Sequence, residues 1–512
     1  LHIEAAKTVA NEKKTQGHRF LLRERRHRMS VTREALHRLR HALPTRIRRS
    51  CPIRVTSPPS GRSTAAPSWK VLLSLLSLVL ATTVWALGLV DSFSKPTVAP
   101  ALSLEQQELT LLAEPQIPAP LRTLLIGADA SDSLLSSLRQ IPLERLDDRQ
   151  KILFTALETD AEHRRSLQQV ELESSDLLQL QKALAEVETR HVSAEERSRL
   201  LLLTSDPLIR RLACEALGGE EKSCLDQTSA RNAARRLVIS ELLPLLALLI
   251  GGLLLVRHLW QLLRRRLPSW PTLTAPPLGI LDMVLLVAGG FVVLGEVLMP
   301  LLVIPMSSVL TRGLSEPLTQ GINVFLGYVA LAAPPLLILR QQLGQLDQAL
   351  TPSQGWLQWR LKPVGSALLQ GARGWLMVLP PVVLCGWLIA RLIGDQGGSN
   401  PLLEIVLNSQ DPVALTLLSL TAVVLAPLFE ETIFRGVLLP VLGQSLGRSG
   451  GVLVSALVFA VAHLSIGELA PLLVLGIGLG LLRLSTGRLL PCVVMHSLWN
   501  GVTFLNLVLL GG

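Results

Sequence analysis

The chain is poor in charged and in aromatic residues. Of its 512 residues, 17% are charged and 4% are aromatic, with a single tyrosine, whereas 49% are hydrophobic. Its mean hydropathy is +0.43. Soluble globular domains carry roughly 25% charged residues. The composition therefore argues against the set of soluble domains that the length alone would suggest, and it indicates a membrane protein.

Common metal and nucleotide signatures are also missing. The five cysteines form no CxxC pair and no zinc-binding spacing, and the sequence holds neither HExxH nor a glycine-rich loop ending in GK[ST]. Cys214 and Cys224 share one polar stretch. They are able to form a disulfide if that stretch is extracytoplasmic, and two unpaired thiols are the alternative.

Nine apolar stretches are candidates for membrane spans, since a helix needs about 20 apolar residues to cross the hydrocarbon. They lie at about 70–90, 240–257, 279–305, 322–339, 374–394, 413–443, 450–466, 469–484 and 489–510. The sequence thus predicts an all-α polytopic membrane protein with about nine transmembrane helices. The domains that we expect are a basic N-terminal segment at 1–69, a first transmembrane helix at 70–91, an extramembrane insert at 92–238, transmembrane helices 2–4 at 239–364, and a C-terminal core at 365–512.

Charge asymmetry predicts the orientation of the spans. Residues 1–70 hold 17 Lys or Arg against 4 Asp or Glu. Because cytoplasmic loops are rich in Lys and Arg, we expect a cytoplasmic N-terminus, with the insert 92–238 and the C-terminus on the opposite side. A nucleic-acid-binding arm is the other interpretation of the basic segment, but its position before the first span favours a topogenic role and no nucleic-acid partner.

The insert 92–238 has a different composition from the rest. Leu and Ala recur at three- and four-residue spacing among charged residues, which is typical of amphipathic helices. It contains no tryptophan and no tyrosine. We expect a helical insert with a small aliphatic core, and we expect it to bind a protein partner rather than to carry out chemistry.

Deeply placed charges come in a group within "EETIFR", residues 430–435. Glu431 and Arg435 are four residues apart on a helix, so they can form an ion pair, which on its own would be purely structural. Glu430 has no basic residue three or four positions away. A carboxylate within a membrane is costly and usually functional, and one without a cation is suited to act as a general base.

Two later stretches carry histidines in apolar surroundings. "FAVAH" places Phe459 and His463 one turn apart, and "HSLWN" places His496 and Asn500 on one helix face. Each can be a packing residue or a hydrogen-bonded bridge between helices. Together with Glu430, they indicate three successive helices whose polar groups meet in one site.

The three stretches in this order, EExxxR, FxxxH and HxxxN, resemble the CAAX prenyl protease 2 and bacteriocin-processing (CPBP, Abi-type) family of intramembrane endopeptidases. The resemblance covers about residues 410–505, within the C-terminal core. It implies that Glu430 activates water, that His463 holds this water, and that His496 and Asn500 stabilise the oxyanion. The supporting residues that it implies are Glu431, Arg435 and Phe459.

The resemblance therefore predicts an intramembrane endopeptidase that cleaves a membrane-associated substrate of CAAX-like or leader type with glutamate-activated water. No cofactor is favoured, and a zinc-dependent version, with Glu430, His463 and His496 as ligands, is the alternative for the chemistry. Two other functions stay open: a catalytically idle scaffold or immunity protein of the same fold, and a transporter that uses the buried carboxylate as a proton carrier. The expected partners are the lipid bilayer, the substrate and a protein that binds the insert.

Overall fold

The structure is a computed structural model of the whole chain. It describes residues 67–511 apart from 96, 128, 168–171, 173, 188–191, 395–397 and 399–400. Most of the basic N-terminal segment expected at 1–69, including Cys51, lies outside the described residues. Residues 53–512 form one compact unit, which contains all of the described residues.

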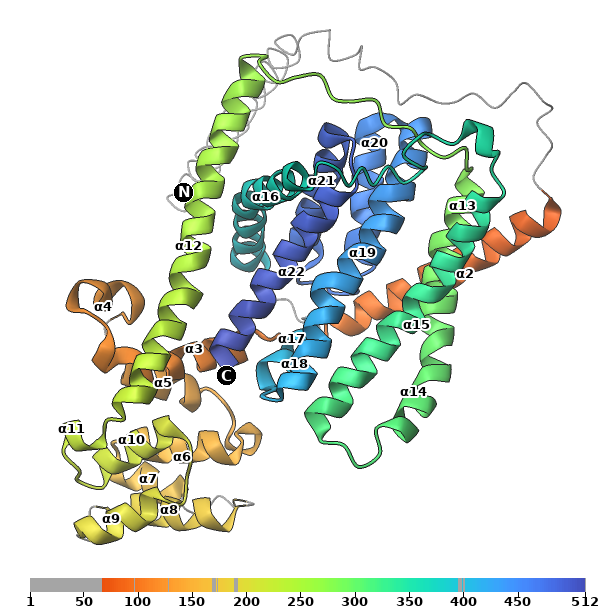
Figure 1. Ribbon diagram of the computed structural model, residues 1–512. Coiled ribbons are helices and arrows are strands. Elements are labelled where there is room, and N and C mark those ends of the chain that lie inside the picture. The colour runs from red at the N-terminus through yellow and green to blue at the C-terminus, as the bar shows by residue number, and fades with distance from the viewer. Residues whose placement is uncertain are drawn as a thin grey trace, which may run out of the picture. The chain divides into compact units, whose positions relative to one another are not determined.

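Every secondary-structure element in the described part of the chain is a helix (Figure 1). Eight of them are long and apolar enough to cross a membrane. They are α2 (Ser68–Ser92), α12 (Gln227–Leu263), the segment α13–η4–α14 (Ile280–Val284, Leu285–Leu298, Met299–Leu310), α15 (Glu316–Gly344), α16 (Val364–Ile393), the segment α18–η6–α19–η7–α20 (Pro412–Ser419, Leu420–Leu425, Ala426–Glu431, Thr432–Leu438, Leu439–Val461), α21 (Leu469–Thr486) and α22 (Leu490–Gly511). The predicted polytopic all-α fold is confirmed. The segments η4, η6 and η7 are π-helical.

The sixth apolar segment covers two of the nine predicted spans, because the chain reverses within α20. Gly447 has φ +73°, in the region that favours glycine, and lies outside helical geometry. The chain after Gly447 runs back along the chain that precedes it. The Ser455 hydroxyl donates a 3.1 Å hydrogen bond to the carbonyl of Phe434, and a Cβ on Gly451 would lie 2.9 Å from the Cα of Gly443. The separate spans expected at 413–443 and 450–466 are thus the two arms of this turn.

Short helices build the insert, and their sequence explains where they begin. They are α3 (Ala99–Ala113), η2 (Glu114–Gln116), α4 (Ala119–Leu125), α5 (Ala130–Arg139), η3 (Leu143–Arg145), α6 (Asp148–Leu157), α7 (Ala161–Leu167), α8 (Ser175–Ala185), α9 (Ala194–Leu201), α10 (Pro207–Ala216) and α11 (Glu221–Cys224). Asp147, Ser193 and Asp206 cap α6, α9 and α10 through side-chain oxygens that accept backbone N–H groups. Two further short elements, α17 (Pro401–Asn408) and η5 (Gln348–Leu350), lie in loops of the membrane part.

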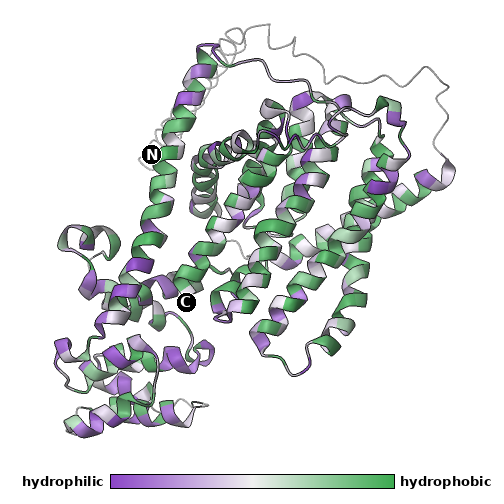
Figure 2. Ribbon diagram, viewed as in Figure 1, coloured by the Kyte–Doolittle hydropathy of each residue, from purple (hydrophilic) through white to green (hydrophobic). Residues whose placement is uncertain are grey.

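The insert and the membrane helices differ in how apolar residues are distributed. Figure 2 shows mixed polar and apolar residues over the insert and mainly apolar ones over the long helices. The core of the insert is mainly aliphatic, with Leu134, Leu153 and Leu180 fully buried, and Phe154 is its buried aromatic residue. The polar stretch also contains a disulfide between Cys214 and Cys224, the first of the two alternatives that the sequence left open.

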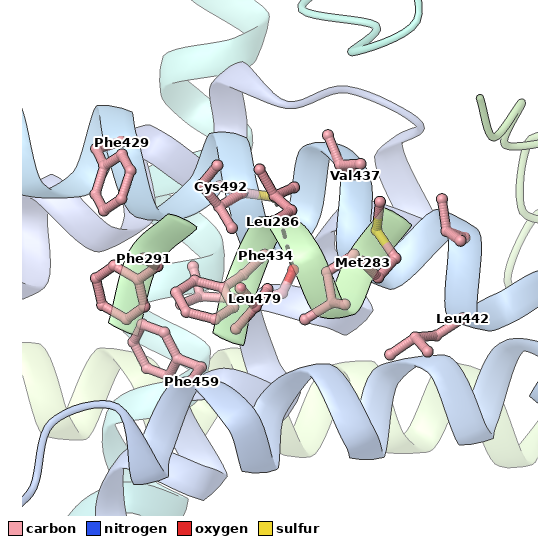
Figure 3. Packing of buried hydrophobic residues seen from close by; sticks show 14 of the residues in the cluster. Met283, Leu286, Phe291, Phe429, Phe434, Val437, Leu442, Phe459, Leu479 and Cys492 are labelled. Atoms are coloured by element: carbon pink, nitrogen blue, oxygen red, sulfur yellow. Dashed lines mark hydrogen bonds between the residues drawn. The ribbon is translucent and has the colours of Figure 1, made fainter. Parts of the chain in front are cut away.

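A cluster of aromatic rings packs around η7 in the centre of the membrane part (Figure 3). The rings of Phe434 and Phe459 meet edge to face at 5.5 Å, and Phe291 contacts Phe434 in the same way at 6.4 Å. Among lipid tails, helices associate through such close packing and through hydrogen bonds. This packing joins η4, η7 and α20, and it fixes the helix turn that carries the charged residues of "EETIFR".

Candidate active site

The paired glutamates lie on the last turn of α19, between the π-helical segments η6 and η7. Pro427, near the start of α19, has no N–H to donate, so it interrupts the regular α-helical ladder at this point. Single π-helical turns within α-helices occur frequently at functional sites. The local sequence therefore gives this stretch an irregular backbone, in contrast to the straight span that apolar periodicity predicts.

Glu431 is the centre of a fully buried network. Its Oε1 accepts hydrogen bonds from Arg435 Nη1 at 2.8 Å and from His496 Nδ1 at 2.9 Å. Neither the Glu431 nor the Arg435 side chain is exposed. Arg435 also donates to the carbonyl of Gly476 at 3.3 Å and lies 4.3 Å from the ring centroid of Phe459. The ion pair that the four-residue spacing predicts is present, and the structure adds His496 to it.

His496, on α22, links the two glutamates. Because a carboxylate oxygen accepts from Nδ1, this nitrogen carries a proton, and Nε2 is the nitrogen that faces Glu430. The distance from His496 Nε2 to Glu430 Oε2 is 3.9 Å. This is too long for a direct hydrogen bond.

Glu430 receives a hydrogen bond that the sequence does not predict. The hydroxyl of Tyr328, on α15, donates to Glu430 Oε1 at 3.0 Å. The other oxygen, Oε2, has no hydrogen-bond partner among the described atoms. No Lys or Arg side chain forms an ion pair with Glu430 in the described part of the chain, and His496 Nε2 lies 3.9 Å from Glu430 Oε2. Tyr328 is the only tyrosine of the chain, and its place in an apolar span is the one signal that could have singled it out.

His463 lies two residues beyond α20, which ends at Val461, so the predicted span 450–466 extends too far at this end. Its side chain is half-buried, and Nδ1 donates to the carbonyl of Phe459 at 2.8 Å, which leaves Nε2 available. The carbonyls of a last helical turn lack intrahelical partners, and this bond satisfies one of them. The Phe459 ring contacts both histidines, with its centroid 4.8 Å from that of the His463 ring and 5.7 Å from that of the His496 ring.

Asn500 lies one turn after His496 on α22 and reaches a different element. Its side-chain amide donates to the carbonyl of Ala422 in η6 at 2.8 Å. The bond uses one of the two amide N–H groups and ties α22 to the helix of Glu430. Among the described residues, the hydrogen-bond partner of Asn500 is therefore backbone, and the two glutamates are joined to α22 through His496.

A second buried guanidinium supports the same turn and was not predicted. Arg483, on α21, is fully buried. It donates from Nε to the carbonyl of Arg435 at 3.0 Å and from Nη2 to the carbonyl of Leu357 at 3.1 Å. Since π-helical turns have irregular backbone hydrogen bonding, this donor stabilises η7 from outside. Arg483 directly follows "GIGLGLL", whose Gly476 packs closely against Ala456.

The zinc alternative requires Glu430, His463 and His496 to share one metal ion. Catalytic zinc sites usually have three protein ligands. In the part of the chain that the structure describes, no three His, Cys, Asp or Glu side chains are grouped so that they could hold a metal ion. Glu431 is already bound to Arg435 and His496. The proposed mechanism is therefore built on the protein side chains alone, and zinc dependence is a question for experiment.

Comparison with known proteins gives two family matches. Residues 412–502, from α18 into α22, match a family described as "Type II CAAX prenyl endopeptidase Rce1-like". Residues 99–235 match a family described as "Domain of unknown function (DUF8675)". Neither the curated proteins nor the solved structures give a match. The first match confirms the family resemblance seen in the three motifs, and all seven residues singled out there lie within it.

Proposed function

Because residues 412–502 match the Rce1-like family of type II CAAX prenyl endopeptidases, we propose that the protein is an intramembrane endopeptidase in which Glu430 activates the attacking water. The observation that carries this proposal is the different environment of the two glutamates. Glu431 is held by Arg435 and His496, whereas Glu430 keeps one oxygen without a partner among the described atoms, 3.9 Å from His496 Nε2.

A water molecule between Glu430 Oε2 and His496 Nε2 would be in position for attack. As the water oxygen bonds to the scissile carbonyl carbon, Glu430 takes the water proton, and it later transfers this proton to the leaving amine as the peptide bond breaks. Tyr328 holds the other oxygen of Glu430, so that Oε2 is directed at the water.

The developing oxyanion needs donors that are already in place. Glu431 accepts from Nδ1 of His496 and holds the imidazole ring with Nε2 toward Glu430, and we assign Nε2, in the imidazolium form, as one donor to the oxyanion. Asn500 retains a second amide N–H after its bond to Ala422, and we assign it to the same oxyanion. His463, with Nδ1 bound to a carbonyl, offers Nε2 to the water. Removing one oxyanion donor typically costs about a hundredfold or more in rate.

The substrate class that fits is a membrane-associated peptide, either a CAAX-like tail or a leader peptide. The description of the matched family names CAAX prenyl endopeptidases. Glu430 lies in the middle of a long apolar segment, so a substrate must present its scissile bond within the membrane or at its surface. The insert 92–238 is a second point of attachment, for which we propose a protein partner.

The decisive experiment compares Glu430→Gln with a matched control, Glu296→Gln. Glu296 is also a carboxylate on a π-helical membrane segment, but it accepts from Trp85 Nε1 at 2.9 Å, and Trp85 has no role in the proposed mechanism. Purified variants are incubated in detergent or liposomes with farnesylated CAAX peptides and with leader peptides. We expect Glu430→Gln to lose about 10²–10⁴-fold in kcat/KM, the usual range for a general base, and Glu296→Gln to stay near wild type.

Retention of activity by a folded Glu430→Gln variant would contradict the proposed mechanism. The scaffold interpretation holds instead if the wild type cleaves no peptide and if Glu430→Gln restores the phenotype of cells that lack the protein. A parallel incubation with a strong chelator, followed by addition of zinc, separates the two forms of protease. Activity that is lost with the chelator and restored by zinc would support the metal-dependent alternative.

A further inference from the structure

A cavity of about 290 Å³ lies where the insert meets the ends of membrane helices, and no residue of the candidate active site lines it. Its walls come from α3, α6, α10 and α12, and from α17 and the C-terminal end of α22, which come close together in Figure 1. Six charged side chains line it: Glu105, Glu108, Asp147, Asp206, Arg149 and Arg236. Four carboxylates thus face two guanidinium groups.

Both guanidinium groups of the cavity are already engaged. Arg149 lies between two carboxylates, with Nη1 2.5 Å from Glu108 Oε2 and Nε 2.6 Å from Asp206 Oδ2. Arg236 donates from Nε to the carbonyl of Leu509 at 2.8 Å and from Nη2 to the carbonyl of Leu510 at 3.1 Å. Arg236 therefore caps the end of α22, where the last helical carbonyls lack partners.

Two of the four carboxylates also have a structural task. Asp147 accepts the backbone N–H of Gln150 at 2.7 Å, and Asp206 accepts those of Leu208 and Ile209 at 2.8 and 3.0 Å. These bonds cap α6 and α10. The caps explain why acids occupy these positions, and they leave Glu105 and Glu108 to be explained.

Glu105 and Glu108 retain unmet acceptor capacity. Glu105 makes no hydrogen bond or ion pair with any described residue, although it faces both arginines of the cavity. Glu108 is 3% exposed, and its Oε1 has no hydrogen-bond partner among the described atoms. A buried carboxylate oxygen without a donor is costly. The two side chains are one helical turn apart on α3 and line the same space.

We propose that this cavity binds an organic cation, whose ammonium or guanidinium N–H groups donate to Glu105 and to Oε1 of Glu108. The lining has two more negative than positive groups, so a cation is the ligand that balances it. About ten water-sized groups fit in the volume, which matches a short polyamine or a single Lys or Arg side chain of a peptide. The described carboxylates are not grouped as metal ligands, which disfavours a bare divalent ion.

The protonation of Glu108 gives the proposal a pH signature. Burial raises the pKa of Glu108 to about 7, with Glu105 and Asp206 adding to this effect and Arg149 opposing it. Burial likewise raises the pKa of Glu105, with Asp147 and Asp206 in the same sense and Arg149 and Arg236 against it. A cation binds the ionised form. Between pH 8 and pH 6 the ionised fraction of a group with the pKa of Glu108 falls about tenfold, so the affinity should fall about tenfold as well.

The test measures binding affinity by isothermal titration calorimetry of the full-length protein in lipid nanodiscs. The probes are spermidine, N-acetyl-lysine amide and N-acetyl-arginine amide, with N-acetyl-norleucine amide as the uncharged control. The polyamine and the two charged amino-acid amides all carry ammonium or guanidinium N–H donors. Tighter binding of spermidine identifies a free polyamine as the natural ligand, whereas tighter binding of an amino-acid amide identifies a peptide side chain.

Glu105→Gln is the main variant, because the Glu105 side chain is partly exposed and makes no bond that folding needs. Its matched control is Glu195→Gln, an exposed carboxylate paired with Arg199 outside the cavity. We expect Glu105→Gln to weaken binding of the charged probes at least tenfold, and Glu195→Gln to leave it unchanged. Equal binding by the two variants, no binding of any charged probe by the wild type, binding of Mg²⁺ or Ca²⁺ alone, or equal affinity for the norleucine amide would each overturn the proposal.

Discussion

Replacing Arg435 with methionine tests the buried network more sharply than any other change. Arg435 and Glu431 are both 0% exposed, and a 2.8 Å hydrogen bond joins them. Arg435→Met keeps a long side chain against the Phe459 ring but removes the positive charge and the donor to Gly476. Glu431 is then left as a buried carboxylate whose remaining hydrogen bond among the described residues comes from His496.

Breaking a buried ion pair by removing one partner typically destabilises a protein by about 3–5 kcal/mol, because the remaining charge is uncompensated. We expect Arg435→Met to lie in this range. The double variant Glu431→Gln with Arg435→Met removes both charges. The main interactions still missing are then the bond to Gly476 and the cation–π interaction with Phe459, so its cost should fall to about 1–2 kcal/mol. The double variant should therefore be about 2–3 kcal/mol more stable than Arg435→Met alone, which marks the two residues as energetically coupled.

Unfolding of the four members of this cycle is followed in detergent micelles titrated with denaturant, by tryptophan fluorescence and by circular dichroism. Cleavage of the peptide substrates is measured on the same preparations. We expect the double variant to recover stability while remaining inactive, since a neutral amide in place of the Glu431 carboxylate is a weaker acceptor for Nδ1 and no longer holds the His496 ring in place. Additive stability losses in the cycle would refute the interpretation of Glu431 and Arg435 as a coupled buried pair.

Three further changes have defined outcomes. Tyr328→Phe removes one donor to Glu430, so kcat/KM should fall about ten- to a hundredfold, as expected for a bond to a charged group, with little change in unfolding midpoint; an unchanged rate would contradict the role of Tyr328. Gly447→Val places a branched side chain at φ +73° and should cost about 1–3 kcal/mol, measured in the same titration, while a neutral result would argue against the reversal. Replacing Cys214 and Cys224 with serine opens a loop with sequence separation 10 and should cost about 2–3 kcal/mol; in the wild type, thiol labelling of these two cysteines before reduction would contradict the disulfide.

The local part of the site could be predicted from the sequence because it depends on spacing along one helix. Glu431 and Arg435 are four residues apart, and this spacing brings two side chains together on almost any helix. The apolar spans were predictable for the same kind of reason, since length and hydropathy alone determine what can cross a bilayer. The small errors lie at helix ends, as for His463, which follows α20 instead of lying within it.

Contacts between different helices could not be predicted from spacing along the sequence. Tyr328 and Glu430 are 102 positions apart, and His496 and Glu431 are 65 apart, so no periodicity relates them. Arg483 is equally hidden, because its acceptors are backbone carbonyls of η7 and of a distant loop, and carbonyls carry no sequence signal.

The sequence by itself therefore determined the membrane character, the apolar spans and the helices that carry the polar residues. Only the tertiary structure decided which glutamate is neutralised and which is left available. That difference arises because Arg435 and His496 converge on one oxygen of Glu431, while Tyr328 donates to Glu430. Helix spacing is a property of one segment, whereas the division of roles between two adjacent acids depends on what the neighbouring helices place beside each of them.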